Sequence, residues 1–132
     1  AKLLYTKVLK DENPILNMQA DGVMIATQTG STGYSLSAGG PVLDPDLDAF
    51  VLTPVCPLGI FHPIVFPANS SLTVNVVRPK KTLVVVDGHH RKTLSGRTIS
   101  IKVTRSNNET RFVRFKENFY HRLKSRLLFK GN

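Results

Sequence analysis

The stretch VMIATQTGSTGYSLSAGGP, residues 23–41, passes from apolar residues into glycines and hydroxyls. Its first part, Val23–Thr27, predicts a strand. The following TGSTGYSLSAGG predicts a short helix that begins near Ser31 with a hydroxyl at its N-cap and ends at the glycine pair Gly39–Gly40. Backbone N–H groups at such a helix start attract phosphate and other acceptors. The residues alone leave two interpretations open: a capped surface helix, or a loop that holds a ligand.

Strand patterns dominate the rest of the chain and indicate a mainly β protein with short helices. β-Branched and apolar residues predict strands at Leu3–Leu9, Phe50–Thr53, Leu72–Val77, Thr82–Val86 and Thr98–Val103. The pair Asp87-Gly88 predicts a tight hairpin turn. We therefore expect residues 72–115 to form an antiparallel meander. A second helix is expected at Lys116–Leu128, where Phe119, Leu123 and Leu127 form an apolar stripe.

Composition limits the possible settings of the chain. It has 132 residues, enough for one domain, and its apolar runs are far shorter than the ~20 residues of a membrane helix. The single Cys56 permits no internal disulfide, fits a reducing cytoplasm, and is expected to be a small buried residue.

The net charge of +9 is unevenly placed, with fifteen Lys and Arg against three acidic residues in residues 78–132. A segment this rich in positive charge suggests either a polyanion partner or a solvated surface.

The segments that flank the loop point to a family. ADGVMIATQTGSTGYSLSAGGPVLDPDLDAFVLTPVCP, HPIVFPANSSLTV and the tail NFYHRLKSRL together resemble the C-terminal domain of NAD kinases, over essentially all 132 residues. The resemblance implies a β-sandwich-like antiparallel domain, with residues 1–132 forming most of the NAD kinase C-terminal domain and an N-terminal α/β domain absent from this chain. The family transfers a phosphoryl group from ATP or polyphosphate, with a divalent metal such as Mg²⁺, to the 2′-hydroxyl of the adenosine ribose of NAD, forming NADP.

The resemblance also implies binding residues. It places NAD at Thr32, Gly33, Tyr34, Ser35 and Ser37, and puts Thr29 near a hydroxyl or phosphate. Asp21 would accept hydrogen bonds from the nicotinamide end, Lys2 would lie near the NAD phosphates, and His89 near the nucleotide. His89 and His90 are expected on opposite faces of a strand, so they would not share a metal. We expect no metal site in this chain.

What the chain lacks matters for activity. The family's general base lies in the N-terminal domain, so we expect no catalytic residue here and no activity from this chain alone. The resemblance further implies a cytoplasmic homo-oligomer, a dimer or tetramer, without membrane contact. Two alternatives are a non-catalytic module for NAD binding or oligomerisation, and a basic β-domain that binds nucleic acid. Few aromatic residues accompany the basic ones, which argues against nucleic acid.

Overall fold

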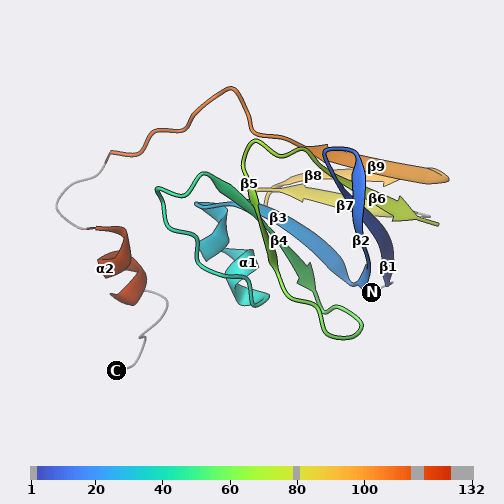
Figure 1. The fold of residues 1–132 in the computed structure, drawn as a ribbon, viewed down its shortest axis with the longest axis horizontal. Helices are drawn as coiled ribbons and strands as arrows, with labels where there is room; N and C mark the ends of the chain where they lie inside the picture. Colours follow the sequence, from blue (N-terminus) through green and yellow to red (C-terminus); the bar gives the residue numbers. More distant parts are fainter. Residues whose placement is uncertain (1–2, 79–80, 114–117, 126–132) are drawn as a thin grey trace.

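Two antiparallel sheets pack face to face in the computed structural model, which describes residues 3–78, 81–113 and 118–125 (Figure 1). The larger sheet has the strand order β2-β1-β6-β9 and the smaller one β3-β4-β5, while β7 and β8 pair only with each other. The strands are β1 (Leu4–Lys10), β2 (Asn13–Ala20), β3 (Gly22–Thr27), β4 (Ala49–Val55), β5 (Ile64–Pro67), β6 (Leu72–Val77), β7 (Lys81–Val86), β8 (His90–Ser95) and β9 (Thr98–Val103). The predicted mainly β, sandwich-like architecture is confirmed.

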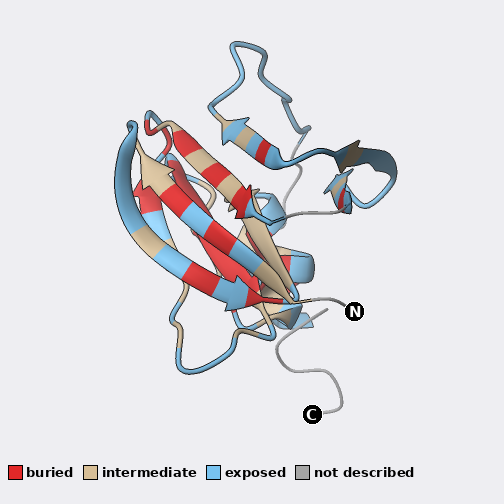
Figure 2. Cartoon of the chain, turned by 90° about the vertical axis from the view of Figure 1, so that its right-hand side faces the viewer, coloured by how far each residue is buried: buried red, intermediate tan, exposed pale blue. Residues whose placement is uncertain are grey.

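The core lies between the two sheets. Val8, Leu72 and Val74 of the larger sheet meet Phe50 and Leu52 of the smaller one in a single buried cluster. Along β6, buried and partly exposed residues alternate, as the period-2 pattern predicted. By contrast, six of the seven residues of β4 are buried, because alternate residues of β4 pack into this cluster on one face and into a second buried cluster on the other (Figure 2). The core thus fixes the strand β3 that leads into the glycine-rich loop.

The predicted meander over residues 72–115 is wrong. β6 pairs with β9 in a continuous register from Leu72↔Val103 to Val77↔Thr98, and the β7–β8 hairpin is inserted between them. After β6, Arg78 adopts a positive φ of 55° that turns the chain out of the sheet. In this register the apolar residues of both strands lie on the same buried face of the sheet. Residues 104–113 form no strand.

Two strands, β2 and β5, had no clear signal in the sequence. β2 contains Pro14, which lowers the strand prediction, and it is joined to β1 by Asp11 and Glu12. Both turn residues have positive φ, 48° and 69°, without being glycine. Asp11 is held in this geometry because its N–H donates to the Ser71 carbonyl and its carboxylate accepts from the Ser71 N–H, at 2.8 and 2.9 Å. The tertiary contact replaces the glycine that sequence patterns look for.

The first predicted helix is divided into two short ones. A 3₁₀ turn, η1 (Gly30–Thr32), and α1 (Tyr34–Ser37) are separated by Gly33, whose φ and ψ of −97° and −129° are not helical. Neither has a side-chain N-cap, so the predicted hydroxyl cap is wrong. The predicted glycine stop is confirmed, because Gly39 has φ +90°.

The C-terminal helix starts later than predicted. α2 spans Phe119–Leu123, and Asn118 is its N-cap: its backbone is extended and its side chain accepts from the His121 N–H at 2.7 Å. Lys116 and Leu127 lie outside the described residues. Leu123 is buried, and no helix among the described residues is long and apolar enough to cross a bilayer.

The Tyr120 hydroxyl of α2 donates to Asp44 at 2.7 Å. Hydrogen bonds from the Asp46 N–H and from Tyr120 lower the pKa of Asp44, and the same contact raises the pKa of Tyr120. The stabilisation from Asp44 is therefore present above its ordinary pKa of 3.8 and is lost as the pH falls through the lowered value. The stabilisation from Tyr120 is present below its ordinary pKa of 10.0 and is lost as the pH rises through the raised value.

We predict that Tyr120→Phe raises the pKa of Asp44, because the phenylalanine cannot donate the hydrogen bond that favours the carboxylate. A titration of the Asp44 carboxyl carbon by NMR measures the pKa directly. Asp46, whose carboxylate accepts no such bond from Tyr120, serves as the internal reference. An Asp44 pKa that is the same in wild type and Tyr120→Phe would show that the contact does not form in solution.

Candidate functional site

The glycine-rich loop begins where β3 ends, and two buried serines attach it to the core. Ser31 is fully buried; its hydroxyl donates to the Gln28 carbonyl at 2.7 Å and accepts from the Leu43 N–H at 3.0 Å. Ser35 is buried beside Thr53 of β4, with the two hydroxyl oxygens 2.9 Å apart. These contacts fix the loop to the core from both helices.

Ser31 was not among the predicted site residues, since nothing in the sequence distinguishes it from an exposed serine such as Ser37. We predict that Ser31→Ala lowers the free energy of unfolding by about 2 kcal/mol, because it leaves the buried Leu43 N–H without its acceptor. Ser37→Ala, at an exposed position, should change it by less than about 0.5 kcal/mol. Chemical denaturation measures both. Equal stabilities for the two variants would contradict this role of Ser31.

The other predicted loop residues face outward. Thr29, Gly33 and Ser37 are exposed, and the Tyr34 side chain is 76% exposed. Thr32 is half-buried, and its hydroxyl donates back to the Thr29 carbonyl at 3.3 Å. An aromatic ring that remains open to solvent on a well-anchored loop can stack on a planar ligand.

His89 lies on the same side of the molecule as Tyr34. It belongs to the β7–β8 turn rather than to a strand, and a Cβ on the preceding Gly88 would lie only 3.7 Å from Cε2 of Tyr34. The prediction that His89 and His90 point to opposite faces is wrong: their rings lie 4.2 Å apart, because the turn brings them together. Among the described residues, no group of three or more His, Cys, Asp or Glu side chains comes together. We therefore assign no metal ligand among these described residues.

Asp21 is placed apart from the loop. It is exposed just before β3, where its N–H donates to the Val55 carbonyl at 2.9 Å. Thr29 lies past the opposite end of β3, which is six residues long, so the two are roughly 20 Å apart at 3.3 Å per residue. Only an extended ligand could reach both from one subunit. Lys2 lies outside the described residues.

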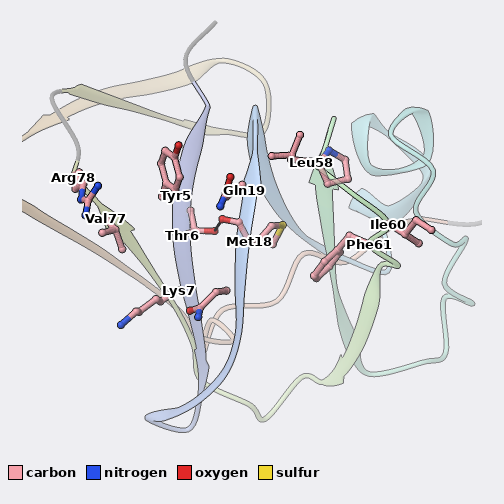
Figure 3. A pocket seen from close by; sticks show the side chains of 12 residues that line it. Tyr5, Thr6, Lys7, Met18, Gln19, Leu58, Ile60, Phe61, Val77 and Arg78 are labelled. Atoms are coloured by element: carbon pink, nitrogen blue, oxygen red, sulfur yellow. Dashed lines mark hydrogen bonds between the residues drawn. The ribbon is translucent and has the colours of Figure 1, made fainter.

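Two hollows lie near the two ends of β3. One, of about 920 Å³, is lined by Thr27–Thr29, Asp87 and the segment 103–110, and includes the ion pair between Arg105 and Asp48. The other, of about 580 Å³, lies between β1, β2, the end of β6 and the loop after β4. Figure 3 shows its lining side chains, among them Tyr5, Lys7, Gln19, Leu58, Ile60, Phe61 and Arg78.

Cys56, in the turn that follows β4, is exposed with φ 47°, so the prediction of a buried cysteine is wrong.

Comparison with known proteins identifies the family to which the chain belongs. The family model of the ATP-NAD kinase C-terminal domain matches residues 1–115. The chain belongs to this family. An NAD kinase of Methanosphaera stadtmanae is 40% identical over 130 residues, covering 97% of this chain and 47% of that protein. An NAD kinase of Treponema pallidum is 43% identical over 118 residues, covering 86% of this chain and 38% of that protein.

Solved NAD kinase structures share the fold of this C-terminal domain. Yeast NADH kinase complexed with NADH matches with a TM-score of 0.83 and 26% identity, over 98% of this chain and 41% of that one. An Archaeoglobus fulgidus NAD kinase in complex with ATP matches with a TM-score of 0.68 and 33% identity, over 78% and 41% of the two chains. The NAD kinase C-terminal domain described here spans about half the length, or less, of these relatives.

Proposed function

We propose that this chain is the NAD-binding half of an NAD kinase. The observation that carries the proposal is the exposed Tyr34 on a loop anchored by Ser31 and Ser35, in a chain whose fold and family are those of NAD kinases. In the reaction, the 2′-hydroxyl of the adenosine ribose of NAD attacks the terminal phosphorus of ATP or polyphosphate. The hydroxyl proton passes to a base outside this chain, a P–O bond forms to the ribose, and the shortened donor leaves.

The chain's own residues would bind and orient NAD. Tyr34 supplies a flat apolar face. Thr32 and Ser37 offer hydroxyls, and Gly33 lets the ligand come close to the backbone. Thr29 borders the larger hollow and would meet a hydroxyl or phosphate. Because Ser35 is buried and bonded to Thr53, we propose that it serves the site by fixing its neighbour Tyr34.

Three further residues complete the proposed site. His89 would lie near the nucleotide, since its turn lies close to Tyr34: a Cβ added at Gly88 would be 3.7 Å from Cε2 of that ring. Asp21 would contact the nicotinamide end of a dinucleotide that extends along β3. Lys2 would lie near the NAD phosphates. The Mg²⁺ that accompanies the donor supplies charge neutralisation for phosphoryl transfer, and we place its ligands outside this chain.

The activity is tested on the complete protein encoded with this chain, with NAD, ATP or polyphosphate and Mg²⁺ supplied and NADP measured. We expect NADP to form, and we expect the 132-residue chain alone to form none because it lacks the base. A complete protein that binds NAD without forming NADP would favour the non-catalytic alternative. Binding that is lost steeply with salt and directed at nucleic acid instead of NAD would favour the basic-domain alternative.

We also propose that the domain forms a homo-oligomer in the cytoplasm. The support is the loop after β4, where Leu58 and Ile60 are 70% and 92% exposed beside the 580 Å³ hollow. Exposed apolar side chains of this kind mark interaction surfaces, and we propose that this one is the contact between subunits.

If that loop forms the subunit contact, Ile60→Asp should weaken association by about 2 kcal/mol or more, since it places a charge in a desolvated contact. Ile15→Asp, an exposed residue on β2, is the matched control. Sedimentation equilibrium reports the mass of each variant. Equal masses for wild type and Ile60→Asp would exclude this loop from the interface.

A further inference from the structure

The segment 41–48 connects the glycine-rich loop to β4 and contains no helix or strand. At its start, the Gly40 N–H donates to the Ser35 carbonyl at 2.7 Å. At its end, the Asp48 carbonyl accepts from the Ala68 N–H at 3.1 Å. Because no helix or sheet ladder pairs the backbone of such a segment, individual contacts of its middle residues decide how firmly it is placed.

In the middle of this segment, Leu43 holds the glycine-rich loop through Ser31. The Leu43 N–H donates to Oγ of Ser31 at 3.0 Å, and both residues are buried. The Ser31 hydroxyl in turn donates to the Gln28 carbonyl at 2.7 Å. Ser31 is the middle residue of η1, whose last residue, Thr32, comes two positions before Tyr34. A shift of Leu43 would therefore be transmitted to the residues that we place at NAD.

The next residue, Asp44, is held by the C-terminal helix. Tyr120 of α2 donates its hydroxyl proton to Oδ2 of Asp44 at 2.7 Å, and Oδ1 of the same carboxylate accepts from the Asp46 N–H at 2.8 Å. The Asp44 carbonyl accepts from the Leu47 N–H at 3.0 Å. The bonds from Asp46 and Leu47 stay within the segment. Among the described residues, the bond from Tyr120 is therefore what joins the Asp44 side chain to another element.

Tyr120 is carried by a helix that has anchors of its own. Asn118 caps α2 by accepting from the His121 N–H at 2.7 Å, and Leu123 at the end of the helix is buried. The ring of Phe119 lies edge-on to the ring of Tyr120, with the centroids 5.1 Å apart. The Tyr120 hydroxyl therefore projects toward the segment from an anchored helix.

We propose that Tyr120 is a positioning residue for NAD, which fixes the segment 41–48 through Asp44 and so holds the glycine-rich loop in place. Leu43 and Ser31 transmit the restraint to the loop. This inference rests on the proposed function, because it takes NAD as the ligand of that loop. Tyr120 itself does not touch the ligand; it reduces the conformational freedom that the loop must lose when NAD binds.

Amide hydrogen exchange, followed by NMR in the complete ligand-free protein, tests the restraint. Tyr120→Phe should speed exchange of the Leu43 amide about threefold or more, because the segment opens more often once Asp44 is released. The amide of Leu52, fully buried in β4, is the internal reference and should not change. Asp46→Ala, which removes a carboxylate that accepts no bond from Tyr120, is the matched control and should leave Leu43 unchanged. Equal changes at Leu43 and Leu52 would show a general loss of stability and would overturn the proposal.

A titration with NAD gives the consequence for binding. Tyr120→Phe should raise the Kd about two- to fivefold, because more of the loop must be ordered on binding, and Asp46→Ala should leave it within about 1.5-fold. Asp44→Asn keeps polar atoms for both partners of the side chain, so it should bind NAD more tightly than Asp44→Ala.

Equal Kd values for wild type and Tyr120→Phe, or a Leu43 amide that exchanges at the wild-type rate in Tyr120→Phe, would overturn the proposal. If the exchange responds as expected but the wild-type protein binds no NAD, the proposed function fails, while the restraint of the glycine-rich loop by Tyr120 stands.

Discussion

Gly40→Ala should unfold the protein more readily than any other single methyl addition to the glycine-rich loop. The new Cβ would lie 2.7 Å from Oγ1 of Thr53 and 2.8 Å from the carbonyl oxygen of Ser35, closer than van der Waals contact allows. It would also meet the Ser35 hydroxyl, so the Ser35–Thr53 bond could not keep its geometry. Overpacking together with a disrupted buried hydrogen bond should cost about 3 kcal/mol of unfolding free energy.

Chemical denaturation of Gly40→Ala and Gly22→Ala measures this effect. Gly22 is the control, because a Cβ there would meet only the Val55 side chain, at 3.6 Å, and its φ is not positive. We expect a change of less than about 1 kcal/mol for Gly22→Ala. A Gly40→Ala protein as stable as Gly22→Ala would show that the loop is not clamped onto β4 in solution.

The second large effect is expected on ligand binding. Tyr34→Ala should raise the Kd for NAD about tenfold or more, since stacking of a base on an aromatic side chain contributes about 1–3 kcal/mol. Its unfolding free energy should change by less than about 0.5 kcal/mol, because the side chain is largely exposed.

Tyr34→Phe is the matched variant for this measurement, because it keeps the ring and removes the hydroxyl. If stacking dominates, Tyr34→Phe should bind NAD within about threefold of wild type. Calorimetric titration of the three proteins gives the Kd values. Equal Kd values for wild type and Tyr34→Ala would remove Tyr34 from the site. Equal losses in both variants would assign the contribution to the hydroxyl.

The fold was predictable where local pattern and tertiary pairing agree. β6 and β9 have the bounds expected from alternation, Leu72–Val77 and Thr98–Val103. Their pairing with each other was not predictable, because alternation reports which face is buried and not which strand lies beside it. β2 was missed for a related reason: the turn before it has positive φ at Asp11 and Glu12, and Asp11 is held there by contacts with Ser71, sixty residues away.

The position of the candidate site in the sequence was predictable, but the arrangement of its side chains was not. The residues alone left a capped helix and a ligand loop open, and the resemblance to NAD kinases predicted the ligand loop with Tyr34, which the structure leaves exposed. Ser31 and Ser35 are buried, whereas Ser37 is exposed. This difference depends on their partners Leu43 and Thr53, which lie outside the loop. The proximity of the Gly88 turn to Tyr34 likewise joins two distant segments, so spacing along the chain gives no sign of it.

The most direct test of the central claim is a titration of the ¹⁵N-labelled chain with NAD, followed by the shifts of its backbone amide signals. If NAD binds at the glycine-rich loop, the largest changes should fall on Thr32–Ser37 and His89, and they should disappear in Tyr34→Ala. Changes confined to the basic residues of β8 and of the segment after β9, or no saturable change at all, would contradict the assignment of this chain as the NAD-binding half of an NAD kinase.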